Sequence, residues 1–457
     1  MIKKTSFIFC VLFSMLCFSQ EKDVDGVSEK FYKGIIDNLV EEQKTKINQL
    51  SKRRGAPQFS LGDFKSADEL FKSIIENKKN VGLLFYTFKN DSLKLSLISK
   101  ASNNFSFDVK INLVESKIGI SKDELANYIK DVNYLYSSAF FNRSPKKRGT
   151  IVIGKKNKKT KLIKSLKKLN NLLFPDSFQL ENFNHLILLP ALNIGTLPFA
   201  AFKIKGKYLI DRMSYSIAPN IYELNISYNK NQNKYGLDGY NDYVNYLWEN
   251  ALFVSNPKYS NNLEWSFPNL PGAEVEVNYI INKSAPTKFK HLSGIKATKE
   301  NIIKDICDYD LIYFATHGIN DFENPMDNSF LVLAEDNSEK PFITSREIQN
   351  IRKKCKLKAD LVVLSACQTG LGKSHEGGTI GLARAFQIAG ANHVLMSLWN
   401  IDDKETATFM KFFFDELAIA KELMPHAALR NAILKYKKEV NDDPKYWAAF
   451  SIFGVPY

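Results

Sequence analysis

The sequence contains few of the residues that build metal centres. Its 457 residues include five cysteines and six histidines, and no Cys-x-x-Cys pair occurs. Two cysteines lie within the first 19 residues, which leaves Cys307, Cys355 and Cys367 in the rest of the chain. Because three is an odd number, at least one of these thiols is free or pairs outside the chain. The scattered histidines argue against a structural zinc site, so we expect no metal.

Arginine is also scarce. Only nine of the 63 basic residues are arginine, although the net charge is +14. Proteins that read nucleic acids favour clustered arginine, whose planar guanidinium binds bidentately. Here lysines are spread along the whole chain, which is typical of a solvated surface. We therefore expect no nucleic acid among the partners.

Long apolar runs are missing after the amino terminus. Residues 1–19 have the pattern of a signal peptide: Lys3 and Lys4 precede an apolar stretch, 7–18, that is too short to span a bilayer. Small residues at Cys17 and Ser19 suit a signal-peptidase site. The sequence thus predicts an exported protein, periplasmic or extracellular, with no membrane span.

The periodicity of apolar residues changes along the chain. Residues 20–79 predict a short helical segment, and 81–98 predict a β-hairpin. A second hairpin is expected from Tyr208–Met213 and Tyr215–Ala218, and an Asn- and Tyr-rich linker at 229–247. The second half alternates strands with helices, including a helix from Thr379 to Ala389 and a last strand from Trp447 to Phe453. This alternation predicts an α/β fold with a mostly parallel sheet covered on both faces.

One stretch, DLVVLSACQTGLG at 360–372, combines a buried strand with reactive chemistry. The apolar run ends in Ser365 and Ala366, and Cys367 follows at the carboxyl end of the strand, where α/β proteins place their sites. Cys367 is therefore either a nucleophile or a small residue that fills the end of a strand.

A histidine follows a second predicted strand, Leu311–Phe314, in the stretch YFATHG. His317 precedes Cys367 by 50 residues, the spacing of the His–Cys order in caspases. Acyl transfer by cysteine needs a thiolate, a histidine that protonates the leaving amine, and donors for the oxyanion. The N–H groups of Gly318 and Cys367 are candidates for the oxyanion hole. The alternative for His317 is a partly buried histidine bonded to the backbone.

Two other patterns follow the carboxyl ends of predicted strands. Gly372-Lys373-Ser374 is similar to the end of a phosphate-binding loop, but the first glycine of that motif would have to stand at Cys367, so we expect no nucleotide cofactor. Asp402 and Asp403 follow the strand 393–399, and they could form an acidic pocket for a lysine or arginine side chain. Asp402 is equally suited to cap the helix that begins there.

With these residues in place, the chain resembles the CHAT family of caspase-like domains, which is related to separases and gingipains. The resemblance runs through LILLPALNIGTLPFAAF (186–202), LPGAEVEV (270–277), YFATHG (313–318), LVVLSACQTGLGK (361–373), EGGTIGLARAFQIAGANHVLMSLWNIDD (376–403) and YWAAFSIFG (446–454).

The resemblance implies a caspase-like three-layer fold over 80–457. An inactive half, 80–246, would pack beside a catalytic half, 247–457. It also implies an endopeptidase that acts on a protein or peptide substrate through His317 and Cys367, with Gly318 in the oxyanion hole and Asp402 or Asp403 selecting a basic residue. The tetratricopeptide array often associated with the family is missing. The alternative function is a non-catalytic scaffold that holds a partner protein.

Overall fold

A computed structural model gives the fold. It describes residues 80–100, 111–141, 155–218, 248–260, 267–319, 326–336, 340–366, 381–399, 401–419 and 424–454, with isolated positions in 34–41, 220–229, 324 and 374–379. The predicted signal peptide and the part of the predicted linker after Asn229 lie outside these residues. Of the helical segment predicted at 20–79, only four positions are described, and all four are helical.

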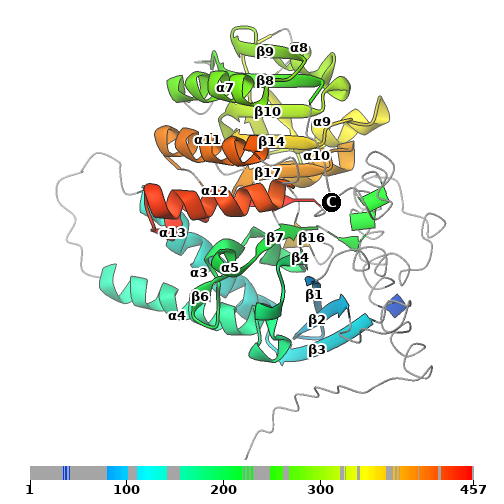
Figure 1. Cartoon of the computed structure of the whole chain (residues 1–457), viewed down its shortest axis with the longest axis vertical. Coiled ribbons are helices and arrows are strands. Elements are labelled where there is room, and N and C mark those ends of the chain that lie inside the picture. The colour runs from blue at the N-terminus through cyan, green and yellow to red at the C-terminus, as the bar shows by residue number, and fades with distance from the viewer. Residues whose placement is uncertain are drawn as a thin grey trace, which may run out of the picture.

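One sheet of eleven strands runs through the chain in the order β3-β2-β1-β4-β7-β18-β17-β14-β10-β8-β9 (Figure 1). Neighbouring strands are parallel except in the pairs β1–β2, β2–β3 and β17–β18. This confirms the predicted α/β fold with a mostly parallel sheet. The strands are β1 (Val81–Lys89), β2 (Ser92–Lys100), β3 (Ile111–Gly119), β4 (His185–Leu189), β7 (Ser214–Ile217), β8 (Asn250–Pro257), β9 (Lys288–Gly294), β10 (Leu311–Thr316), β14 (Leu361–Ala366), β17 (His393–Ser397) and β18 (Phe450–Phe453).

Helices cover both faces of the part of the sheet formed by β8, β10, β14, β17 and β18. One layer consists of α7 (Pro271–Ser284), α11 (Asp403–Ile419) and α12 (Pro425–Glu439), and the opposite layer holds α8 (Lys299–Ile303), α9 (Ser345–Asn350) and α10 (Leu382–Ala389) (Figure 1). Strands β4, β10 and β14 are buried along their whole length, as expected of parallel strands between two layers. The remaining helices are α3 (Lys122–Phe141), α4 (Lys155–Leu173), α5 (Leu209–Arg212) and α13 (Pro444–Trp447).

The two halves of the sheet join where β18 lies beside β7. Phe453 pairs with Ile217, and the Gly454 N–H donates to the Ile217 carbonyl at 3.0 Å. Gly454 has a φ of +139°, and a Cβ there would lie 2.6 Å from the Asn392 carbonyl oxygen, so this position requires glycine. The sheet is continuous across the junction, and the division at residue 246 stays a prediction.

The chain reverses its direction across the sheet after β9. From β8 it moves through α7 to β9 at the edge, and from β9 it returns past β8 to β10. The carboxyl ends of β8 and β10 therefore flank a topological switch point. In open parallel sheets, the loops that leave such a point diverge and form the ligand-binding crevice.

The hairpin expected at Tyr208–Ala218 is wrong. Tyr208 ends the short strand β6 (Lys207–Tyr208), which pairs with β5 (Lys203–Ile204), and the chain then forms α5. Strand β7 runs parallel to β4 instead of pairing with the preceding segment. In a run this short, Leu209, Ile210 and Met213 fit one turn of helix as well as a strand, so periodicity could not distinguish the two.

Two element boundaries also differ from the sequence prediction. Helix α10 begins at Leu382 instead of Thr379, because β16 (Gly378–Thr379) pairs with β15 (Ser374–His375). The last strand begins at Phe450, since Trp447 ends α13. Residues near element ends satisfy local patterns of both states, which makes boundaries the least certain part of a sequence prediction.

A disulfide joins Cys307 to Cys355, with 6.3 Å between their Cα atoms. Cys307 precedes β10 and Cys355 precedes β14, so the bond ties these strands at their amino ends. Of the three cysteines after the predicted signal peptide, Cys367 is the one that this bond does not use.

Removal of this disulfide is expected to destabilise the fold. The bond closes a loop with a sequence separation of 48, and such a cross-link contributes about 2–4 kcal/mol, chiefly by restricting the unfolded chain. The double variant Cys307→Ser/Cys355→Ser should lose that amount in urea unfolding. A reducing agent should lower the midpoint of the parent protein to that of the variant and leave the variant unchanged. A parent protein indifferent to the reducing agent would contradict the assignment.

Candidate active site

His317 stands directly after β10, and a backbone carbonyl fixes its ring. Nε2 lies 2.7 Å from the carbonyl oxygen of Pro268, in the loop between β8 and α7. A carbonyl oxygen only accepts hydrogen bonds, so Nε2 carries a proton and donates it. Proton exchange at His317 is therefore left to Nδ1.

Two aromatic rings enclose the imidazole of His317. The ring centroids of Tyr259 and Phe267 lie 4.9 and 5.3 Å from it, respectively. Burial lowers the pKa of His317, while the Pro268 carbonyl and the charge of Asp403 act in the opposite direction. The net shift is downward, which favours the neutral imidazole at neutral pH.

The register of β10 against β14 brings two strand ends together. Leu311 pairs with Leu361, and the pairing continues to Thr316 opposite Ala366. His317 is the next residue after Thr316, and Cys367 is the next after Ala366. Cys367 itself lies outside the described residues.

Gly318 begins β11 (Gly318–Ile319), which pairs antiparallel with β12 (Phe330–Val332). The Val332 N–H donates to the His317 carbonyl at 2.8 Å. Hydrogen-bonded and non-hydrogen-bonded pairs alternate in antiparallel ladders, so the next pair, Gly318 with Leu331, is of the non-hydrogen-bonded type. The N–H of Gly318 consequently points away from β12.

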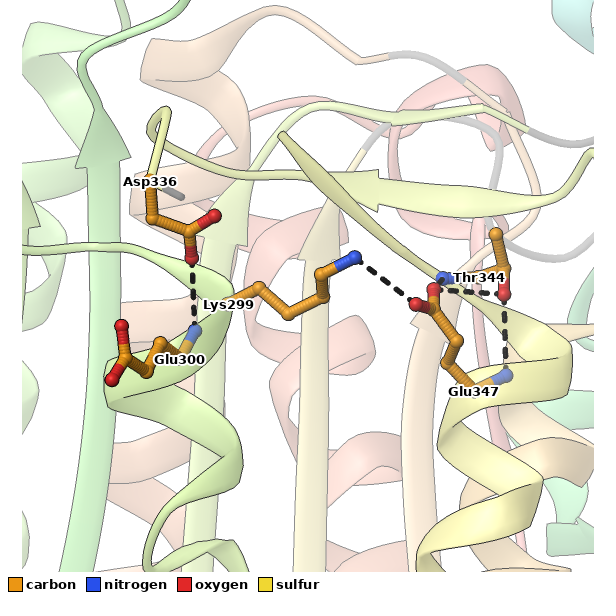
Figure 2. A network of polar contacts seen from close by, with 5 residues as sticks. All are labelled: Lys299, Glu300, Asp336, Thr344 and Glu347. Atoms are coloured by element: carbon orange, nitrogen blue, oxygen red, sulfur yellow. Dashed lines mark hydrogen bonds and ion pairs between the residues drawn. The ribbon is translucent and has the colours of Figure 1, made fainter. Parts of the chain in front are cut away.

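A polar network supports the small sheet that carries Gly318 (Figure 2). Thr344 ends β13 (Phe342–Thr344), the partner of β12, and forms a capping box with Glu347 at the start of α9. The other carboxylate oxygen of Glu347 accepts from Lys299 of α8 at 3.0 Å. Beside it, Asp336 accepts from the backbone N–H of Glu300 at 3.0 Å. The hairpin that follows His317 is thus connected to two helices.

A cavity of about 50 Å³ lies at the same edge of the sheet. It is enclosed by side chains from α7, β10, β14, β17 and α11. Asp403 is one of the residues that line it and Asp402 is not. The lining residues are Leu270, Ala273, Glu276, Ala315, Thr316, Ser365, Ala366, Ser397, Ile401, Asp403 and Thr406.

Asp403 is held at the amino-terminal end of α7. Its Oδ2 accepts the backbone N–H of Gly272 at 2.9 Å, where the helix dipole favours a negative charge. The contact is close: a Cβ on Gly272 would lie 2.1 Å from the same oxygen. Glycine at this position therefore lets the aspartate approach the helix end.

Glu276 is a second carboxyl group in the cavity, and the sequence analysis assigned it no role. It is buried, and its Oε1 accepts the Tyr313 hydroxyl at 2.5 Å. Burial raises the pKa of Glu276 to about 7, against the hydrogen bonds of Tyr313 and Ser365; the negative charge of Asp403 also raises it. The sequence signals a role for Glu276 only through its place in LPGAEVEV, and this motif does not indicate which residues Glu276 contacts.

No pattern in the sequence indicates the residues that position His317. Pro268, Phe267 and Tyr259 lie in the loop that leaves β8, next to the switch point. Their types alone indicate no such contact. Among the described residues, no group of three or more His, Cys, Asp or Glu side chains could hold a metal ion.

Comparison with protein families agrees with this geometry. The model of the CHAT domain matches residues 163–455, well over half of the chain. The chain belongs to the CHAT domain family.

Individual relatives are distant. Tetratricopeptide repeat protein 28 of Homo sapiens is 24% identical over 306 residues, 59% of this chain and 12% of that protein. Its Mus musculus counterpart is 25% identical over 239 residues, 45% of this chain and 9% of that protein. The CHAT protein described here thus spans about a tenth of the length of these relatives.

The fold is also similar to that of one chain in a solved two-protein complex. The Saccharomyces cerevisiae separase–securin structure superposes with a TM-score of 0.52 and 13% identity, covering 85% of this chain and 31% of that chain. The likeness confirms the caspase-like fold.

No helix among the described residues is long and apolar enough to cross a membrane.

Gly272→Ala is expected to disturb the Asp403 contact. The added methyl group would overlap Oδ2, and such overpacking costs roughly 1–3 kcal/mol. Urea unfolding measures the loss. Gly119→Ala is the matched control, because a Cβ there meets nothing within 4 Å. Equal stability of both variants would show that Asp403 is not held as described.

Proposed function

We propose that this CHAT protein is a cysteine endopeptidase in which Cys367 is the nucleophile and His317 the general acid. The observation that carries the proposal is the register that places Thr316 opposite Ala366, because the two candidate residues follow these positions directly. The Pro268 carbonyl supports it by orienting the imidazole and leaving Nδ1 for the reaction.

The chemistry proceeds in two stages. The Cys367 thiol first gives its proton to Nδ1 of the neutral His317 imidazole. The resulting thiolate forms a bond to the scissile carbonyl carbon, and the N–H groups of Gly318 and Cys367 stabilise the oxyanion. The C–N bond then breaks as protonated His317 gives its Nδ1 proton to the leaving amine. Water then attacks the thioester carbonyl carbon while His317 takes its proton at Nδ1. The C–S bond breaks, the acid product is released, and His317 returns the proton to the sulfur of Cys367. One oxyanion donor contributes on the order of 10²–10³ in rate.

The preferred substrates carry lysine or arginine before the cleaved bond. Asp403 lines the cavity beside His317 and supplies a fixed negative charge for a basic side chain. The backbone carbonyl of Asp402 accepts the Thr406 N–H at the start of α11, which supports a helix-capping position for that residue.

The protein acts outside the cytoplasm in this proposal. The predicted signal peptide directs export, and the Cys307–Cys355 disulfide is typical of oxidising compartments. The competing function is a scaffold without catalysis. It is favoured by the names of the human and mouse relatives, which refer to tetratricopeptide repeats and not to peptidase activity.

Peptide hydrolysis tests the dyad. Cys367→Ala should abolish turnover of peptides with lysine or arginine before the bond, and His317→Ala should lower kcat by about 10²–10⁴ because it removes the proton donor. Unfolding curves of both variants control for folding. Undiminished hydrolysis by Cys367→Ala rejects the nucleophile. The scaffold alternative predicts no turnover by the parent protein and no reaction of Cys367 with a peptide warhead.

Adjacent aspartates provide a matched pair for specificity. Asp403→Asn keeps an oxygen for the Gly272 N–H but removes the charge, so kcat/KM for arginine peptides should fall about 10²-fold. Asp402→Asn should change it less than about threefold, because this residue does not line the cavity. The reverse pattern would assign the pocket to Asp402.

A further inference from the structure

Glu276 is a buried ionisable group that the proposed catalytic steps do not use. Its side chain is 4% exposed, yet it lines the cavity together with Asp403. An ionised carboxylate in such a place is costly unless it is paired. The hydrogen bonds from Tyr313 and Ser365 offset only part of that cost, because its pKa remains raised to about 7.

Among the described residues, the side chains that shift the pKa of Glu276 include no cation. Strand β10 brings Tyr313, β14 brings the hydroxyl of Ser365, and α11 brings Asp403. Strand β8, which also packs against α7, contains no titratable side chain in Asn250–Pro257. Besides burial, the interactions that shift the pKa of Glu276 are hydrogen bonds from two neutral donors and the charge of a second carboxylate.

We propose that Glu276 is the second carboxylate of the substrate pocket and, together with Asp403, binds the cationic end of the basic side chain that enters it. This inference rests on the proposed peptidase function, whose pocket it extends. Asp403 is fixed to the amino end of α7 and Glu276 lies one turn further along the same helix, so both carboxylates border one small cavity.

Two carboxylates suit a guanidinium group, which presents several N–H donors in one plane. Entry of the cation favours the ionised form of Glu276, so its proton is released as the ligand binds. Because the pKa of Glu276 is about 7 in the free protein, binding at pH 7 should release about half a proton per ligand. At pH 8.5 the release should be close to zero.

Titration calorimetry with butylguanidine tests this directly, with neutral butylurea as the isosteric comparison. The full chain carrying Cys367→Ala is used, so that no turnover is involved. The parent pocket should bind butylguanidine and not butylurea, and the binding heat at pH 7 should depend on the ionisation heat of the buffer. Glu276→Gln should weaken butylguanidine binding about 10–100-fold and abolish the proton release.

Two further variants keep the test decisive. Tyr313→Phe removes a hydrogen bond that lowers the pKa of Glu276, so the pH range of proton release should move upward even if Glu276→Gln folds poorly. Glu405→Gln is the matched control: Glu405 also accepts a tyrosine hydroxyl, from Tyr436, but it does not line the cavity. Glu405→Gln should bind butylguanidine as the parent does.

The outcomes separate this inference from the proposed function. Equal affinity and equal proton release in Glu276→Gln and the parent would overturn the role of Glu276, as would a parent that binds no butylguanidine. Glu276-dependent binding in a protein that hydrolyses no peptide would support the cation pocket and reject the peptidase.

Discussion

The parallel pairing of β10 with β14 is the constraint on which the candidate site depends. Its register of 50 residues puts Thr316 beside Ala366 at the carboxyl ends of two strands that are buried along their whole length. A shift by one residue would turn every side chain of β14 to the other face of the sheet, away from its packing partners. The core therefore fixes the register, and the register fixes which residues leave the two strands side by side.

The segment from Pro268 to Glu276 connects this pair of strands to the helices. It holds the imidazole of His317, receives Asp403 at the end of α7, and contacts Tyr313 of β10. All three contacts are made by the loop and helix that follow β8, next to the point where the chain reverses its direction across the sheet. Orientation of the histidine and the charge of the cavity are thereby set by one short stretch of chain.

Two carboxyl groups line the cavity, and the ionised form of Glu276 is unfavourable there. Burial raises the pKa of Glu276, and the negative charge of Asp403 adds to this effect. Groups that disfavour the folded state in this way occur preferentially at functional sites, where a ligand supplies the missing interaction. The strong packing of β10 and β14 around them offsets the cost within the fold.

Features that depend on a few neighbouring residues could be predicted from the amino-acid sequence. Buried strands such as Leu361–Ala366 were predicted from their apolar runs, because such a signal acts over a few residues. Long motifs indicated the CHAT family. Two apolar runs indicated that His317 and Cys367 each follow a strand. Local pattern failed at Leu209–Arg212, where a six-residue run suited helix and strand alike.

Contacts between residues far apart in the sequence are visible only in the folded protein. Pro268 and His317 are 49 residues apart, and Gly272 and Asp403 are 131 apart, so no local rule could pair them. The stretch DLVVLSACQTGLG shows the same division. Its apolar residues predict a strand, but only the order of strands in the sheet shows that β10 lies beside it. Long-range packing sets that order, and with it the cavity that Glu276 and Asp403 share.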